Sequence, residues 1–264
     1  MVKSKTPKTK VAKAKKPIIE VKSLVKKYGK KTAVNGISFS VNRGEIFGIL
    51  GPNGAGKTTT LEMMETLRPI DSGSVIIDGI DVSQNPHKIR SIIGVQPQSP
   101  GFQDKTKLSE LIKMFASAYG KKVDPIEFLK QVDLEEKADS YVENLSGGQK
   151  QRFSIVTALV HDPKVFFLDE PTTGLDPQAR RNLWKLIKQI RDKGISIIIT
   201  THYMDEAETL CDRIAIMHKG EIIQLDSPKK LIKDLLARGF KKPQFVEQAN
   251  LEDVFLDLTG RELK

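Results

Sequence analysis

The sequence predicts an α/β fold with a mainly parallel sheet, an N-terminal antiparallel β subdomain and an inserted helical subdomain. Over most of the 264 residues, short runs of apolar and β-branched residues alternate with stretches of helical periodicity. This alternation is typical of strand–helix–strand units that build a parallel sheet. From about residue 99 to 144 the periodicity is helical instead, with Leu108, Leu111, Ile112 and Phe115 at helical spacing. This helical block is therefore expected to interrupt the α/β core.

The first half of the chain is expected to contain strands on both sides of a single helix. The strands are predicted at 18–24, 32–41, 45–50, 74–78 and 92–95, and the first two are expected to be antiparallel. A helix is expected from Lys57 to about Leu67, because Pro69 cannot continue it.

The second half returns to apolar strands separated by helical stretches. Strands are predicted at 165–168, 196–200, 213–217 and 221–224, and helices around 178–192 and 204–210. Near the C-terminus, four apolar residues at helical spacing predict a short helix packed on the domain. These residues are Leu251, Val254, Phe255 and Leu258.

Composition limits the classes of protein that fit this chain. With 39% apolar residues, it can form one large domain, or a domain with a small insertion. Cys211 is the only cysteine, which excludes an intramolecular disulfide and fits a reducing cytosol. No apolar run approaches the ~20 residues that a membrane-spanning helix needs. No apolar stretch follows the basic N-terminus, so no secretory signal is expected.

The net charge of +10 arises mainly from the N-terminus. Residues 1–17 contain seven lysines and no acid, and without them the net charge falls to +3. A segment of this composition cannot bury a core, so it is expected to be disordered. It is interpreted as a solvating extension. The second interpretation is attraction to anionic lipid head groups, at ~1 kcal/mol per lysine. Binding of nucleic acid is the weakest alternative.

A glycine-rich loop predicts a phosphate-binding site. This phosphate loop consists of Gly51, Pro52, Asn53, Gly54, Ala55, Gly56, Lys57 and Thr58, and Thr59 follows it. The glycines let successive N–H groups turn toward a phosphate, and the following helix directs its positive dipole end the same way. Lys57 is expected to reach the β- and γ-phosphates, and the Thr58 hydroxyl to bind Mg²⁺. The predicted ligands are ATP and Mg²⁺.

Two carboxylates follow the apolar strand predicted at 165–168. Asp169 and Glu170 stand at its carboxyl end, where α/β sheets bind their ligands. Asp169 is expected to hold Mg²⁺. Glu170 is expected to polarise the water that attacks the γ-phosphorus.

The order of these segments resembles the nucleotide-binding subunit of ABC transporters, which has a P-loop NTPase core. The phosphate loop is followed by Leu145-Ser146-Gly147-Gly148-Gln149, Asp169-Glu170, Gly174-Leu175-Asp176 and His202. The resemblance begins near residue 18 and continues to the C-terminus. It implies an ABC ATPase domain at 18–228, after a disordered tail at 1–17, and a C-terminal helical extension at 229–264.

The resemblance also implies roles for single residues. Tyr28 corresponds to the aromatic residue that stacks on adenine. Gln98, rather than Gln96, corresponds to the glutamine that contacts Mg²⁺ and the attacking water. Asp176 corresponds to the acid that communicates across a dimer, and His202 to the residue that contacts the γ-phosphate. Together with Glu170, Gln98 and His202 complete the expected catalytic set.

The segment 145–149, here called the clamp segment, has the features of a second anion site. Ser146 supplies a hydroxyl, Gly147 and Gly148 allow close backbone approach, and a helix is expected to start near Gln149. The helical insert separates this segment from the phosphate loop of the same chain. In the family, the clamp closes over ATP bound to a partner. The resemblance therefore implies a homodimer or heterodimer of ATPase subunits around two ATP molecules.

A transport function is implied by the same resemblance. It requires integral membrane permease subunits that dock on the helical insert, and a position on the cytoplasmic face of the cell membrane. The residues at 251–263 resemble the tail of ABC-2 exporter ATPases, including drug-resistance exporters, which favours export over import. The alternative is a soluble ABC ATPase that drives no transport, such as a cluster-assembly factor.

Overall fold

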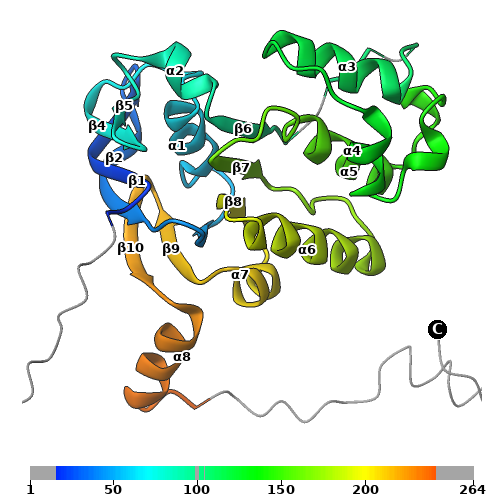
Figure 1. Cartoon of the computed structure of the whole chain (residues 1–264). Helices are drawn as coiled ribbons and strands as arrows, with labels where there is room; N and C mark the ends of the chain where they lie inside the picture. Colours follow the sequence, from blue (N-terminus) through cyan, green and yellow to red (C-terminus); the bar gives the residue numbers. More distant parts are fainter. Residues whose placement is uncertain (1–15, 99–100, 104, 242–264) are drawn as a thin grey trace, which may run out of the picture. The chain divides into compact units, whose positions relative to one another are not determined.

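The computed structural model describes residues 16–98, 101–103 and 105–241 (Figure 1). The chain divides into a first unit, Met1–Pro228, and a second unit, Lys229–Lys264. The lysine-rich tail, apart from Lys16 and Pro17, and the helix predicted around 251–258 lie outside the described residues. Within the described ranges, no helix has the length and apolar character needed to cross a membrane.

The first unit begins with a four-stranded antiparallel sheet in the order β2-β1-β4-β5. Its strands are β1 (Ile19–Tyr28), β2 (Lys31–Val41), β4 (Ser72–Ile77) and β5 (Ile80–Asp81). Val21 of β1 lies opposite Phe39 of β2 on one side and Val75 of β4 on the other. All three side chains are buried, so one face of this sheet supplies part of the core.

A six-stranded sheet forms the centre of the first unit, in the order β10-β9-β3-β8-β7-β6. The strands are β3 (Ile46–Leu50), β6 (Ile93–Gln96), β7 (Val165–Asp169), β8 (Ser196–Thr201), β9 (Arg213–His218) and β10 (Glu221–Asp226). Neighbouring strands are parallel except β10, which is antiparallel to β9. Every residue of β3, β7 and β8 is buried, which explains why these strands are continuous apolar runs. The predicted α/β fold is confirmed.

Helices flank the six-stranded sheet and also form the predicted insert (Figure 1). Beside the sheet are α1 (Lys57–Met64), α2 (Pro86–Arg90), α6 (Pro177–Asp192) and α7 (Met204–Leu210). A separate group, green in Figure 1, contains α3 (Leu108–Ala118), α4 (Pro125–Lys130) and α5 (Gly147–Thr157), with 3₁₀ turns at Glu135–Lys137 and Val142–Asn144. The helix α8 (Pro228–Ala237) begins at the last residue of the first unit, and its other residues belong to the second unit.

Two predicted helix limits were wrong, each for a local backbone reason. The first helix, α1, ends at Met64 instead of continuing to Leu67, because Thr66 adopts a left-handed φ of 65°. The N–H groups of Leu67 and Arg68 then turn back to the carbonyl of Glu62. The helix α5 begins at Gly147, two residues before Gln149, because Ser146 and Gln149 cap it through each other's backbone N–H groups.

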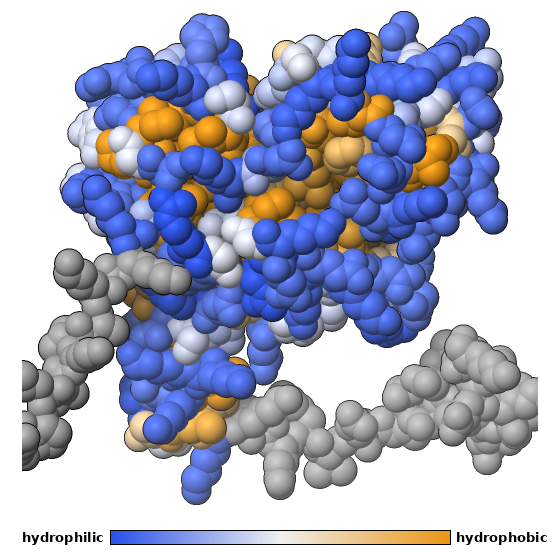
Figure 2. Space-filling view, in the orientation of Figure 1, coloured by the Kyte–Doolittle hydropathy of each residue, from blue (hydrophilic) through white to orange (hydrophobic). Residues whose placement is uncertain are grey.

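The two sheets meet in one hydrophobic core. The rings of Phe39 in β2 and Phe47 in β3 are stacked, with centroids 5.1 Å apart and an angle of 6° between their planes. Burying these rings removes a large apolar area from water at the junction of the sheets. On the outside of the first unit, apolar residues are also exposed among hydrophilic ones (Figure 2). Part of this apolar surface lines a groove that is described below.

Candidate functional site

A cavity of about 600 Å³ lies at the carboxyl ends of the central strands, beside the phosphate loop. Predicted site residues line it from five separate parts of the chain. They are Tyr28, Asn53, Gly54, Gly56, Lys57, Thr58, Thr59, Gln98, Glu170 and His202. The exposed fraction of Tyr28 is 42%, although Nζ of Lys26 and Cζ of Arg68 lie 5.7 and 5.6 Å from the centroid of its ring.

The phosphate loop needs glycine at two positions for steric reasons. A Cβ atom on Gly51 would lie 2.2 Å from the carbonyl oxygen of Met217 in β9. Gly56 has a φ of 104°, and a Cβ atom there would lie 2.4 Å from the carbonyl oxygen of Ala33 in β2. Glycine therefore allows the loop to approach both neighbouring backbones and to enter α1 directly at Lys57.

The turn between β9 and β10 holds the phosphate loop against the antiparallel sheet. The N–H group of Gly220 in this turn donates to the carbonyl of Ala55, at 3.0 Å. The carbonyl of Gly220 accepts from the N–H group of Asn35 in β2, at 2.8 Å. The Asn35 side chain also donates to Glu221, at 2.7 Å. The loop, the turn and β2 are thus joined by backbone hydrogen bonds.

Lys57 is a buried cation whose ammonium group is fully engaged. Its Nζ donates to the carbonyl oxygens of Gly51 at 2.9 Å and Pro52 at 3.2 Å. It also lies 3.1 Å from Oε1 of Glu170. A buried ammonium is stabilised only by such pairing and hydrogen bonding. The position of Nζ at the cavity wall is suited to a phosphate oxygen.

Asp169 and Thr58 present oxygen atoms to each other at the end of β7. The Thr58 hydroxyl donates to Oδ1 of Asp169 at 3.3 Å, and the Thr200 hydroxyl donates to the same oxygen. Burial raises the pKa of Asp169, although the two hydroxyl groups partly offset this effect. Hydroxyl and carboxylate oxygens are ligands that Mg²⁺ prefers.

These two oxygens do not form a complete metal site by themselves. Within the described part of the chain, no cluster of three or more His, Cys, Asp or Glu side chains is arranged to hold a metal ion. Mg²⁺ is usually bound by one or two protein ligands together with substrate phosphates and water. Thr58 and Asp169 fit this kind of shared site.

Glu170 is the residue on which the other polar groups of the cavity converge. Oε2 of Glu170 lies 3.5 Å from Nε2 of Gln98, 3.4 Å from the Thr173 hydroxyl and 3.2 Å from Nδ1 of His202. Burial alone would raise the pKa of Glu170. The net pKa is nevertheless lowered, because Lys57 and His202 favour the charged form.

The backbone also fixes the position of Glu170. Its φ of 46° is in the left-handed region, which is uncommon for a residue with a side chain. Its N–H group donates to the carbonyl and the hydroxyl of Thr200, at 3.2 and 3.0 Å. The chain therefore turns sharply just after β7, and the Glu170 carboxylate reaches the cavity.

The structure distinguishes between Gln96 and Gln98, the two candidates for the glutamine of the site. The side chain of Gln96 has no exposed surface and donates to the carbonyl of the adjacent Pro97. Gln98 lines the cavity and points its amide toward Glu170. Of the two side chains, the structure brings only that of Gln98 to the phosphate loop.

The clamp segment is not among the residues that line this cavity. Ser146 instead caps α5, where its hydroxyl accepts from the N–H group of Gln149 at 3.3 Å. The Gln149 side chain accepts in return from the N–H group of Ser146 at 3.0 Å, which completes a capping box. Leu145 is buried, whereas Ser146 and Gly147 are exposed. The start of α5 therefore faces solvent and is free to contact another molecule.

Asp176 has a structural partner at the start of α6. Its carboxylate accepts from the N–H group of Ala179 at 2.8 Å, and Pro177 occupies the first helical position. Gly174 nearby adopts a left-handed φ of 76°. Asp176 is exposed at this turn and does not line the phosphate cavity.

Two residues behind the cavity were not predicted from the sequence. Thr200, at the end of β8, bonds to both Asp169 and Glu170. Glu206, in α7, has no exposed surface and accepts from Nε1 of Trp184 in α6 at 3.0 Å. Thr200 could have been identified from the sequence, because it is a polar residue near the end of an otherwise apolar strand. The burial of Glu206 depends on packing between two helices, so no local signal identified it.

Comparison with known proteins identifies the family. The model of the family described as ABC transporter matches residues 34–173, which is more than half of the chain. The chain is 41% identical over 221 residues to Nod factor export ATP-binding protein I of Ralstonia nicotianae, covering 82% of this chain and 69% of that protein. It is 40% identical over 219 residues to linearmycin resistance ATP-binding protein LnrL of Bacillus subtilis, covering 81% and 70% respectively.

Solved structures agree with this assignment. A structure described as the ATP-binding subunit of an ABC transporter matches with a TM-score of 0.75 and 29% identity, covering 92% of this chain and 99% of that chain. The cbiO1 protein of Clostridium perfringens, part of the ABC transporter complex cbiONQ, matches with a TM-score of 0.74 and 31% identity, covering 84% and 94%. The chain therefore belongs to the ABC transporter family, as an ATP-binding subunit.

Proposed function

We propose that this chain binds Mg²⁺ and ATP, dimerises around two ATP molecules and powers export through separate membrane subunits. The convergence of Lys57, Gln98 and His202 on Glu170 is the observation that best supports it. Export is supported by the relatives, which are described as a Nod factor export protein and a linearmycin resistance protein.

The residues around Glu170 have complementary roles in the proposed hydrolysis. The Lys57 ammonium binds the β- and γ-phosphates, and the phosphate-loop N–H groups surround them. The Glu170 carboxylate accepts a hydrogen bond from the attacking water, while Gln98 and His202 position the water and the γ-phosphate. Thr58 and Asp169 would hold Mg²⁺. When bound, Mg²⁺ neutralises part of the charge on the β- and γ-phosphates.

A shared site between two subunits accounts for the position of the clamp segment. Ser146 and Gly147 are exposed at the N-terminus of α5, and neither lines the cavity that contains Lys57. The N-terminus of a helix attracts anions because its N–H groups and dipole point outward. In the proposed dimer, this end of α5 contacts the γ-phosphate of ATP bound to the partner. The geometry suits either two copies of this chain or a related second subunit.

The partner in the membrane is proposed to dock on the helical insert. Such docking places the chain on the cytoplasmic face of the cell membrane, where ATP is available. Residues 1–17, with seven lysines, would add attraction to anionic lipid head groups. Deleting residues 1–17 should then weaken binding to vesicles that contain phosphatidylserine, and leave binding to neutral vesicles unchanged.

Reconstitution tests the proposed function directly. The tagged chain is recovered from detergent-solubilised membranes of its own organism, and the membrane subunit that copurifies is placed with it in proteoliposomes. ATP-dependent movement of a substrate toward the side opposite the ATPase would support export. Recovery of only soluble partners, with full ATPase activity, would instead support an ATPase that drives no transport.

A further inference from the structure

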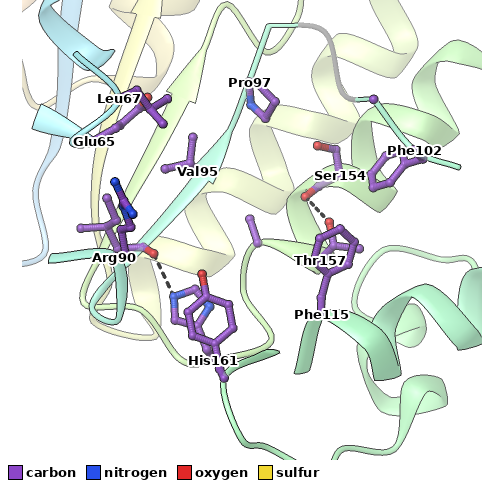
Figure 3. A pocket seen from close by; sticks show the side chains of 14 residues that line it. Glu65, Leu67, Arg90, Val95, Pro97, Phe102, Phe115, Ser154, Thr157 and His161 are labelled. Carbon is purple, nitrogen blue, oxygen red and sulfur yellow. Dashed lines mark hydrogen bonds between the residues drawn. The ribbon is translucent and has the colours of Figure 1, made fainter. Parts of the chain in front are cut away.

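A second cavity, of about 380 Å³, lies between β6 and the helices α3 and α5 (Figure 3). We call this cavity the insert groove. Much of its wall is apolar, with Val95, Pro97, Phe102 and Phe115 contributing side chains. The Phe102 ring meets Phe115 edge-on, with ring centroids 6.4 Å apart. The groove is therefore suited to an apolar side chain from a partner.

Glu65 places a carboxyl group in this apolar groove. The residue directly follows α1, and its exposed fraction is only 6%. Figure 3 shows Glu65 and Arg90 on one side of the groove, and Phe102 and Phe115 on the other. No hydrogen bond or ion pair joins the Glu65 side chain to another residue in the described part of the chain. A buried acid without a partner is costly to keep charged.

Among the described residues, the basic groups that line the groove do not pair with Glu65, and Nδ1 of His161 has no hydrogen-bond partner. Nε of Arg90 donates to the Thr66 hydroxyl at 2.8 Å, and the Arg90 side chain is exposed. Nε2 of His161 bonds to the carbonyl of Ile93 at 2.8 Å, and the His161 ring is stacked on Tyr119. Glu65 is thus left as an acceptor that faces the groove. A cation from a partner is the chemistry that would complete this site.

Burial and neighbouring negative charge explain the protonation state of Glu65 in the absence of a partner. Burial, together with the negative charges of Asp169 and Glu62, raises the pKa of Glu65 to about 8. The carboxyl group is therefore largely neutral near pH 7. A cation placed beside it would favour the carboxylate and form a buried, charge-assisted pair.

We propose that Glu65 recognises a basic side chain on the segment of the membrane subunit that enters the insert groove. The apolar residues next to this basic side chain pack on Val95, Phe102 and Phe115. This inference rests on the proposed function, since it requires a membrane subunit. It adds the chemical identity of the contact: one cation flanked by apolar side chains. A membrane subunit without a basic residue in the docking segment would be bound poorly.

Two charge changes at Glu65 and one matched control test this inference. Glu65→Gln keeps the shape but cannot form the ion pair, and Glu65→Lys reverses the charge. Glu62→Gln is the control, because Glu62 precedes Glu65 by one helical turn and pairs with Arg68 instead. Each tagged variant is expressed with the membrane subunit that copurifies with the unmodified chain. The affinity of the purified subunits is then measured in detergent, and ATP binding by each variant checks that it is folded.

The expected result is specific to Glu65. Glu65→Gln should weaken binding of the membrane subunit by about 30-fold or more, as when one member of a buried charge pair is removed. Glu62→Gln should bind like the unmodified chain. In the membrane subunit, each Arg and Lys residue of the cytoplasmic loops is then changed to Glu, one at a time. One of these changes should restore binding to the Glu65→Lys variant.

Other results would separate the two proposals. Equal binding of the membrane subunit by Glu65→Gln, Glu65→Lys and the unmodified chain would overturn the role of Glu65 and leave the proposed function standing. Failure of the unmodified chain to recover any membrane subunit would overturn the proposed function, and the role of Glu65 with it.

Discussion

Nζ of Lys57 lies 3.1 Å from Oε1 of Glu170, and both side chains are buried. The two residues come from the phosphate loop and from the end of β7, which are more than one hundred residues apart in sequence. Their pairing neutralises two charges that would otherwise be costly in the interior. ATP phosphates at this site would compete with Glu170 for the lysine. Binding of nucleotide is therefore expected to release the Glu170 carboxylate for its role with water.

Changing Glu170 to glutamine should separate ATP binding from hydrolysis. Glutamine preserves the shape of the side chain but cannot accept the proton of the attacking water, so turnover should fall by about 100-fold or more. ATP binding should be retained, and an ATP-bound dimer should accumulate. Phosphate release and size-exclusion chromatography with ATP measure the two effects. Undiminished hydrolysis would show that Glu170 is not the catalytic base.

The lowered pKa of Glu170 predicts how this residue affects stability across pH. Burial opposes ionisation, but Lys57 and His202 bring the folded-state pKa below the ordinary value of 4.5. Ionised Glu170 therefore stabilises the fold above pH 4.5, and this stabilisation is lost as the pH falls through the folded-state pKa. Urea unfolding of the unmodified chain and Glu170→Gln should show a difference in the free energy of unfolding that shrinks at acidic pH. A difference that stays constant from pH 7 to pH 3 would contradict this prediction.

Changing Ser146 to arginine should block hydrolysis and leave ATP binding to the single subunit largely intact. The bulky cation would obstruct the exposed start of α5, where the partner's nucleotide is expected. The variant also loses the helix cap, at a cost of about 1 kcal/mol. Ser146→Ala loses the same cap without the bulk and serves as the matched control. If Ser146→Arg abolished ATP binding by the monomer, the shared-site arrangement would be wrong.

Removing the indole donor of Trp184 should destabilise the region behind His202. Nε1 of Trp184 is bonded to Glu206, which has no exposed surface. Trp184→Phe would remove one of the donors to this carboxyl group, beside the hydroxyl groups of Thr201 and Thr172, at an expected cost of about 1 kcal/mol in the free energy of unfolding. Thermal or urea unfolding measures the change. Trp184→Phe combined with Glu206→Leu should recover part of the loss, because both polar partners are then removed together.

The central strands could be predicted because strands that are buried on both faces have continuous apolar sequences. Phe166 and Ile198, for example, have no exposed surface and stand in continuous apolar runs. Elements too short to show periodicity were not predicted, namely β5 with two residues and α2 with five. The early end of α1 depends on the left-handed backbone of Thr66, a residue type that does not usually predict such a conformation.

In the candidate site too, local sequence features could be predicted, whereas contacts between distant residues could not. The glycines of the phosphate loop were predictable, since few other functions require them in that order. The contact between Gln98 and Glu170 joins residues 72 positions apart, and only the folded sheet brings them together. The absence of a partner for Glu65 among the described residues is a further example. It depends on which neighbours are already bonded to other groups, and the sequence does not contain that information in any local pattern.

The hydrogen bonds of Gly220 have a practical consequence for anyone who labels or fuses this protein. The turn after β9 is short and lies between exposed residues, so it resembles a convenient place for an epitope or a fluorescent domain. An insertion there would separate Gly220 from Ala55 and Asn35. The fusion would then lose nucleotide affinity, although the insertion point lies more than 160 residues from the phosphate loop in the sequence. A label on the exposed side chain of Lys185, in α6, would avoid this damage.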